Sequence, residues 1–162
     1  MAFDRLESPG HVVNYLARLF AGGLYRRIGA HGVNTGQFPV LLMLWEQDGV
    51  TQASLVEKLA VEQPTMAGTL KRMERAGLIK RVADPNDRRQ AHVHLTRKGR
   101  ALEDALVAGA KDTTAIALAG VTAAESAQFM KLARRMSENL ERDDLLSERA
   151  RGRVARANQD GR

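Results

Sequence analysis

The chain has 162 residues, a length that suits one domain with a modest core or a domain with helical arms. It has no cysteine, which excludes disulfides, thiolate metal sites and thiol redox sensors. No segment approaches the roughly 20 consecutive apolar residues that cross a bilayer, and the N-terminus lacks the basic and apolar regions of a signal peptide. We therefore expect a cytoplasmic protein with no membrane partner.

The formal net charge of +6 is unevenly distributed. Residues 68–100 hold ten Lys or Arg against three Asp or Glu, a local charge of +7, and residues 149–162 hold five Arg against one Asp. A basic central third indicates a polyanionic partner, of which nucleic acid is the commonest. The alternative is a charged face that is simply solvated, and charge does not decide between the two.

Apolar spacing predicts three helices in the first part of the chain. Residues 11–28 carry apolar side chains at helical spacing, which predicts a long amphipathic helix. Residues 38–47 are apolar on nearly every side, so we expect a buried helix there, ended by Asp48 and Gly49. Thr51 is then expected to cap a short third helix.

A fourth helix is predicted over residues 64–76, with Gln63 as its N-cap. Met66, Leu70 and Met73 share its apolar face. The opposite face is small at its start and cationic further along, and it comprises Pro64, Ala67, Gly68, Lys71 and Arg75, flanked by Thr65 and Arg72. With the third helix it fits a helix-turn-helix whose second helix enters the DNA major groove. An ordinary surface helix is the alternative.

Residues 78–82 and 91–95 predict the two strands of a hairpin. The segment DPNDRRQ between them has turn chemistry, because Asp and Asn bond locally to the backbone and Pro presets φ. We therefore expect Arg88 and Arg89 to lie near the tip of the hairpin.

Two more helices follow, one over residues 97–118 capped by Thr96 and one from residue 123 to about Leu140, opened by a capping box of Thr122 and Glu125. The apolar stripe of the last helix comprises Phe129, Leu132, Ala133, Met136 and Leu140. A winged domain offers these helices no partner, so we expect a homodimer through the terminal helices. Residues 143–162 are expected to form a basic, disordered tail.

The segment VEQPTMAGTLKRMERAGLIKR and the following DPNDRRQAHVHLTRKGRAL resemble the MarR family of bacterial regulators, including its SlyA-like branch. The resemblance extends over residues 10–142 and implies a mainly α fold with a small β-hairpin wing. A winged helix-turn-helix lobe (33–100) would be flanked by dimerisation helices (10–32 and 101–142). It also implies a homodimer that binds a pseudo-palindromic double-stranded DNA operator, most often as a repressor. A small aromatic ligand would release the DNA from a crevice between the dimer helices and the lobe.

The resemblance places the DNA contacts on the fourth helix and the wing. On the helix they would be made by Gln63, Pro64, Thr65, Gly68, Thr69, Lys71, Arg72 and Arg75. Some relatives carry an arginine at the position of Gly68, where its fork reads a guanine edge, and a glycine cannot do this. In the wing, Asp87 would orient one of Arg88 and Arg89 while the other enters the minor groove. The sequence does not tell which arginine has which role.

The resemblance also suggests residues for the effector crevice. They are His11, Asn14, Tyr15, Arg18, Phe38, Leu42 and Trp45. An aromatic acid or aromatic acyl-CoA is the hypothesis, because Arg18, Arg26 and Arg27 could meet a carboxylate or phosphates. The alternative is that the aromatic side chains belong to the core and that the arginines are solvated or ion-paired.

Other functional classes find little support in the sequence. It has no Gly-rich phosphate loop and no arrangement typical of an enzyme, so we expect neither catalysis nor a cofactor. His92 and His94 share a strand face and could begin a metal site, but no third ligand is obvious, and we expect no metal. The alternative function is protein-protein assembly by a winged-helix protein that binds DNA only non-specifically.

Overall fold

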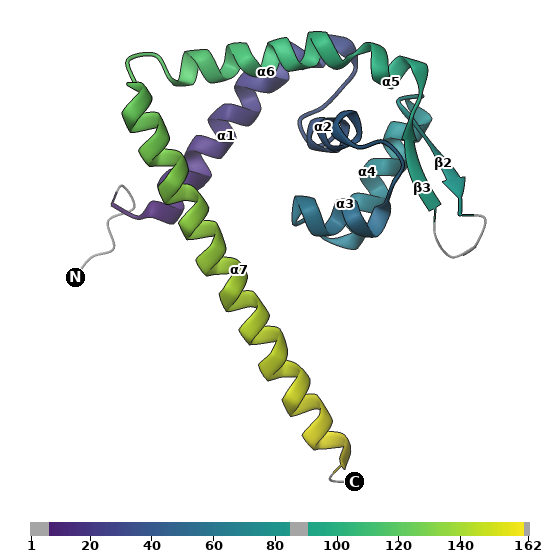
Figure 1. Cartoon of the computed structure of the whole chain (residues 1–162), viewed down its shortest axis with the longest axis vertical. Coiled ribbons are helices and arrows are strands. Elements are labelled where there is room, and N and C mark those ends of the chain that lie inside the picture. The colour runs from purple at the N-terminus through teal and green to yellow at the C-terminus, as the bar shows by residue number, and fades with distance from the viewer. Residues whose placement is uncertain (1–6, 85–90, 161–162) are drawn as a thin grey trace. The chain divides into compact units, whose positions relative to one another are not determined.

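The computed structural model describes residues 7–84 and 91–160, with side chains described as far as residue 143. The chain divides into two compact units, Met1–Ala117 and Leu118–Arg162. The first unit contains most of the helices and the sheet, and the second contains one long helix (Figure 1). None of the described helices is long and apolar enough to cross a membrane.

In the first unit, α1 (Pro9–Ile28) packs against α6 (Glu103–Ala117). Two glycines bring these helices close together. A Cβ atom at Gly23 would lie 3.0 Å from Cγ2 of Thr113, and one at Gly109 would lie 3.1 Å from Cβ of Arg27. A short 3-10 helix, Gly29–His31, leads from α1 towards the lobe.

The lobe contains α2 (Phe38–Glu46), α3 (Gln52–Leu59), α4 (Gln63–Arg75) and a small antiparallel sheet (Figure 1). Its strands are β1 (Val50–Thr51), β2 (Ile79–Ala83) and β3 (Ala91–Leu95), in the order β1-β3-β2. The β2–β3 register pairs Ile79 with Leu95 and Ala83 with Ala91, as expected for a hairpin. The predicted mainly α fold with a small wing is therefore confirmed, whereas β1 was not predicted because two residues give no periodicity.

One continuous apolar core joins the lobe helices to the sheet. It includes Leu41 and Leu44 of α2, Leu55 of α3 and the α4 residues Leu70 and Met73, all at most 1% exposed. Because α4 turns this face inward, its opposite face is left at the surface. The apolar spacing in the sequence thus determines which side of α4 can meet a partner.

The turns around the core have clear local causes. The Thr51 hydroxyl accepts a hydrogen bond from the Ser54 N–H and caps α3, as predicted. Gly77, at φ 69°, ends α4 in the left-handed region that favours glycine. The helix α4 begins at Gln63 and its N-cap is Glu62, one residue earlier than predicted. The predicted helix over residues 97–118 is divided into α5 (Arg97–Ala101) and α6, because the backbone turns at Leu102.

The second unit consists of α7 (Ala123–Asp160). The predicted capping box is present, since the Thr122 N–H donates to the Glu125 carboxylate at 2.8 Å and the Glu125 N–H donates to the Thr122 hydroxyl at 3.2 Å. The bond from the Thr122 N–H, followed by one of 2.7 Å that the Thr122 hydroxyl donates to the same carboxylate, lowers the pKa of Glu125. The predicted end near Leu140 is wrong, and residues 143–160, expected to be a disordered tail, continue the helix. Four Arg, three Ala and two Leu among these residues favour helix even without an apolar stripe.

Candidate nucleic-acid interface and ligand pocket

The surface face of α4 begins bare and becomes cationic. Of the eight helix residues predicted to contact DNA, six are exposed and Gly68 is half-buried. The exposed six are Gln63, Pro64, Thr65, Lys71, Arg72 and Arg75. Small residues in the first turns allow the backbone to approach a groove, and the cations further along can meet phosphates.

Thr69 differs from the other seven because it is only 6% exposed and lies on the buried face of α4. Its hydroxyl accepts a hydrogen bond of 3.0 Å from Nη2 of Arg72. A Cβ atom added at Gly68 would lie 3.4 Å from Nη1 of the same arginine. The Arg72 guanidinium therefore lies back along α4, against the turn that contains Gly68 and Thr69.

Several cations of the basic central third hold the lobe together. Lys98 donates from Nζ to the Ala76 carbonyl oxygen at 2.9 Å, next to the C-terminal end of α4, where a positive charge is favourable. Arg81 on β2 pairs with Glu74 on α4 at 3.6 Å. These contacts join α4 to the strand and to α5, so the charge count of the sequence overstates the number of cations free to bind a partner.

The Asp48 carboxylate organises the start of the sheet. It accepts hydrogen bonds from the Leu95 N–H at 2.8 Å and from the Arg100 guanidinium at 2.7 Å, and it lies 3.5 Å from Nδ1 of His94. Burial raises the pKa of Asp48, but the hydrogen bonds from Leu95, Arg100 and His94 outweigh this effect, and the pKa is lowered. The side chain predicted to end a helix thus anchors β3 as well.

His92 lies between two acceptors at the base of the hairpin. Its Nε2 is 2.9 Å from Asp84 and its Nδ1 is 2.7 Å from the Gly49 carbonyl oxygen. A carbonyl can only accept, so a doubly protonated ring donates to both groups, and the hydrogen bond to Asp84, followed by that to Gly49, raises the pKa of His92. No group of three or more metal-ligating side chains occurs among the residues that the structure describes.

A groove of about 540 Å³ lies beside the start of α4 and connects it to α3 and the sheet. It is lined by Thr51, Gln52, Ala53, Gln63, Arg81, Ala91 and Val93. Gln52 donates to the Gln63 side-chain oxygen at 3.1 Å and so joins the two helices of the helix-turn-helix at the surface. Neither Gln52 nor Arg81 was predicted as a site residue from the sequence, although Arg81 lies in the basic region. The predicted wing residues Asp87, Arg88 and Arg89 lie outside the described residues.

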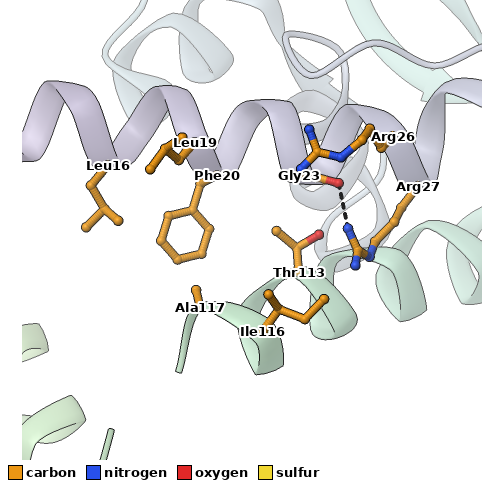
Figure 2. A pocket seen from close by; sticks show the side chains of 9 residues that line it. All are labelled: Leu16, Leu19, Phe20, Gly23, Arg26, Arg27, Thr113, Ile116 and Ala117. Carbon is orange, nitrogen blue, oxygen red and sulfur yellow. Dashed lines mark hydrogen bonds between the residues drawn. The ribbon is translucent and has the colours of Figure 1, made fainter. Parts of the chain in front are cut away.

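A second cavity, of about 450 Å³, lies between α1 and α6. Figure 2 shows the side chains of Leu16, Phe20, Ile116 and Ala117 around it, with Arg26 and Arg27 at the end near Gly23. Leu19, Gly23 and Thr113 complete its lining. Arg27 donates from Nη1 to the Gly23 carbonyl oxygen at 2.9 Å (Figure 2). The cavity therefore combines apolar walls with two cations, a combination suited to an amphipathic acid.

None of the seven residues predicted for the effector crevice lines this cavity. Phe38 is 5% exposed and packs edge-to-face on Trp45, with the ring centroids 6.3 Å apart. The Trp45 indole N–H donates to the Gly99 carbonyl oxygen at 3.1 Å. Arg18 lies over the Tyr15 ring, 6.0 Å from its centroid. His11, Asn14 and Leu42 are at least partly accessible.

Comparison with known proteins points to one family. The model of the MarR family matches residues 33–91. The HTH-type transcriptional regulator YybA of Bacillus subtilis is 30% identical over 108 residues, which are 67% of this chain and 72% of YybA. The HTH-type transcriptional repressor NicR of Pseudomonas putida is 27% identical over 137 residues, which are 85% of this chain and 87% of NicR.

Among solved structures, that of Bordetella bronchiseptica BpsR matches with a TM-score of 0.77 and 28% sequence identity. The match covers 85% of this chain and 98% of the BpsR chain. The BpsR structure concerns the mechanism by which 6-hydroxynicotinic acid regulates DNA binding by BpsR. The matches identify the family and not a branch within it, so the SlyA-like assignment stays a prediction. Together with the winged lobe and the exposed face of α4, they show that the chain belongs to the MarR family of DNA-binding transcriptional regulators and is not an enzyme.

Proposed function

We propose that this regulator is a cytoplasmic repressor that binds a pseudo-palindromic operator as a homodimer and releases it when an aromatic acid or aromatic acyl-CoA binds. The observation that carries the proposal is the surface face of α4, which presents Pro64 and Thr65 at its start and Lys71, Arg72 and Arg75 further along. Such a helix can enter the major groove with its N-terminal half while its cations meet phosphates and base edges. The description of the relative NicR as a repressor supports the sign of the regulation.

Exposed apolar side chains support the homodimer. On α7, Phe129, Leu132 and Met136 are between 40% and 49% exposed, and on α1 Leu19 and Tyr25 are more than half exposed. Apolar rows on long helices are typically covered by another subunit, and a two-fold axis would then place two copies of α4 on two operator half-sites.

We place the effector in the cavity between α1 and α6. Its volume suits a small aromatic acid, its apolar walls would cover a ring, and Arg26 and Arg27 would meet the carboxylate. The aromatic acid associated with BpsR supports this chemical class. The predicted crevice near His11, Asn14, Tyr15, Arg18 and Leu42 is the other location to be tested, whereas Phe38 and Trp45 serve as packing residues.

A pair of matched variants tests the location. Thermal shifts should be measured with aromatic acids and their CoA thioesters on the parent protein, on Arg26→Gln and on Arg18→Gln. We expect Arg26→Gln to reduce the shift and Arg18→Gln to preserve it. The reverse result would move the effector to the predicted crevice, and shifts of zero with both compound classes would contradict the effector proposal.

Footprinting of the region upstream of the protein's own gene, followed by a salt titration, tests DNA recognition. A specific regulator keeps a large preference for its operator over random DNA as salt rises, because base contacts are less sensitive to salt than phosphate contacts. Parallel loss of both affinities would favour the alternative function of protein-protein assembly with non-specific DNA binding. Replacing Arg88 and Arg89 together should sharply weaken operator binding without dissociating the homodimer, and unchanged affinity would remove the wing from the interface.

A further inference from the structure

We infer that Gly68 and Thr69 are positioning residues that set the base preference of Arg72. The inference rests on the proposed function, in which α4 reads the major groove. Thr69 is 6% exposed, so its side chain is poorly placed to touch a base directly. Its hydroxyl instead accepts a hydrogen bond of 3.0 Å from Nη2 of Arg72. Thr69 therefore acts on DNA recognition through the position of the Arg72 guanidinium.

Gly68 supplies the space for this arrangement. A Cβ atom at this position would already lie 3.4 Å from Nη1 of Arg72, so a larger side chain would have to share the volume that the guanidinium occupies. Another cation here would also lie one helical turn from Arg72, at a spacing where like charges repel. The absence of a side chain at Gly68 therefore lets the arginine of the next turn cover this part of the helix.

The bond between Thr69 and Arg72 reduces the conformational entropy that the Arg72 side chain loses when it binds DNA. An arginine side chain loses substantial conformational freedom when it is fixed on binding, and a bond that already exists in the free protein removes part of that loss. One N–H of Nη2 is engaged by Thr69, which leaves other guanidinium donors for the two acceptors of a guanine edge. Arg72 is exposed, so these donors remain accessible to DNA.

The test measures base preference at every operator position for a set of variants. Arg72→Ala identifies the position that Arg72 reads, where preference should fall by about 5- to 150-fold. Thr69→Val, which keeps the shape but lacks the acceptor, should reduce preference at that same position by roughly 2- to 10-fold. Thr69→Ser, which keeps the acceptor, should retain it.

A second variant covers the case in which Thr69→Val does not fold. Gly68→Val lies on the surface face of α4 and favours the helix over glycine, yet it should displace the guanidinium and relax the same position. Each substitution is repeated in the Arg72→Ala background. There, neither should change preference further, because both act through the arginine.

The outcomes separate the two proposals. If the parent protein shows no operator preference, the proposed function fails. If Arg72→Ala relaxes one position but Thr69→Val and Gly68→Val leave it unchanged, or change it equally without the arginine, the positioning role is overturned while the proposed function stands.

Discussion

The Asp48 carboxylate accepts a hydrogen bond of 2.8 Å from the backbone N–H of Leu95 and thereby joins the end of α2 to the end of β3. Asp48→Ala removes this acceptor and leaves Arg100 without its ion pair. We expect the free energy of unfolding to fall by about 1–3 kcal/mol, the cost of leaving a partly buried donor unsatisfied. Urea unfolding measures it, and Asp112→Ala, at an exposed position of α6, is the control; equal effects would contradict the anchoring role.

Gly99 is required by close packing. A Cβ atom there would overlap the Leu78 carbonyl oxygen, and this backbone atom has little freedom to move. Gly99→Ala should therefore destabilise the protein by about 1–3 kcal/mol or more. At Gly10 on α1 a Cβ atom meets nothing within 4 Å, so Gly10→Ala should be neutral or stabilising, and similar melting temperatures for the two variants would refute the packing explanation.

His92 makes stability depend on pH. Its pKa is raised by Asp84 and by the Gly49 carbonyl, so its contribution is fully present below the unfolded-state pKa of about 6.5 and is lost as pH rises through the folded pKa. His92→Gln should thus cost more stability at pH 6 than at pH 8.5, as measured by urea unfolding at both values.

The matched control for this pH dependence is His94→Gln, since the His94 ring lies on the same strand 6.5 Å from that of His92 and pairs with Asp48. The His94 variant should keep the pH-dependent component, because Asp84 and Gly49 still face His92. A pH dependence that is unchanged in His92→Gln would assign it to another group.

The α7 stripe makes a prediction about assembly. Leu132→Glu combined with Met136→Glu places two charges on exposed apolar positions, and we expect it to produce monomers and to abolish operator binding. Arg134→Glu changes the net charge by the same amount on the other side of α7 and should preserve the homodimer. Sedimentation equilibrium distinguishes these outcomes; a dimeric double variant would exclude this stripe from the interface.

Much of the lobe was predictable because its signals are local. The apolar face of α4, the Thr51 cap and the Thr122 capping box each depend on residues within one or two helical turns. The resemblance to the family correctly indicated the winged fold as well. Short or distant features were missed, including the two residues of β1 and the bond between Asp48 and Leu95, which lie 47 positions apart.

In the candidate site too, local features could be predicted from the sequence and contacts between distant segments could not. Sequence spacing identified the exposed face of α4 without Thr69, and only the resemblance to the family counted Thr69 among the DNA contacts. Only the packed structure shows that Thr69 is buried and bonded to Arg72. The cavity between α1 and α6 depends on how two distant helices pack around Gly23 and Gly109, and no local pattern reports that.

The Thr96 hydroxyl connects three segments of the regulator. It donates towards the Gly77 carbonyl oxygen at 2.6 Å, just after α4, and it accepts from the Gly99 N–H at 3.1 Å at the start of α5, while its own residue follows β3. The end of α4, the end of β3 and the start of α5 therefore meet at Thr96. A small rotation of α5 should move the ends of α4 and β3 together, and under the proposed function this movement would reposition both elements on DNA without bending either of them.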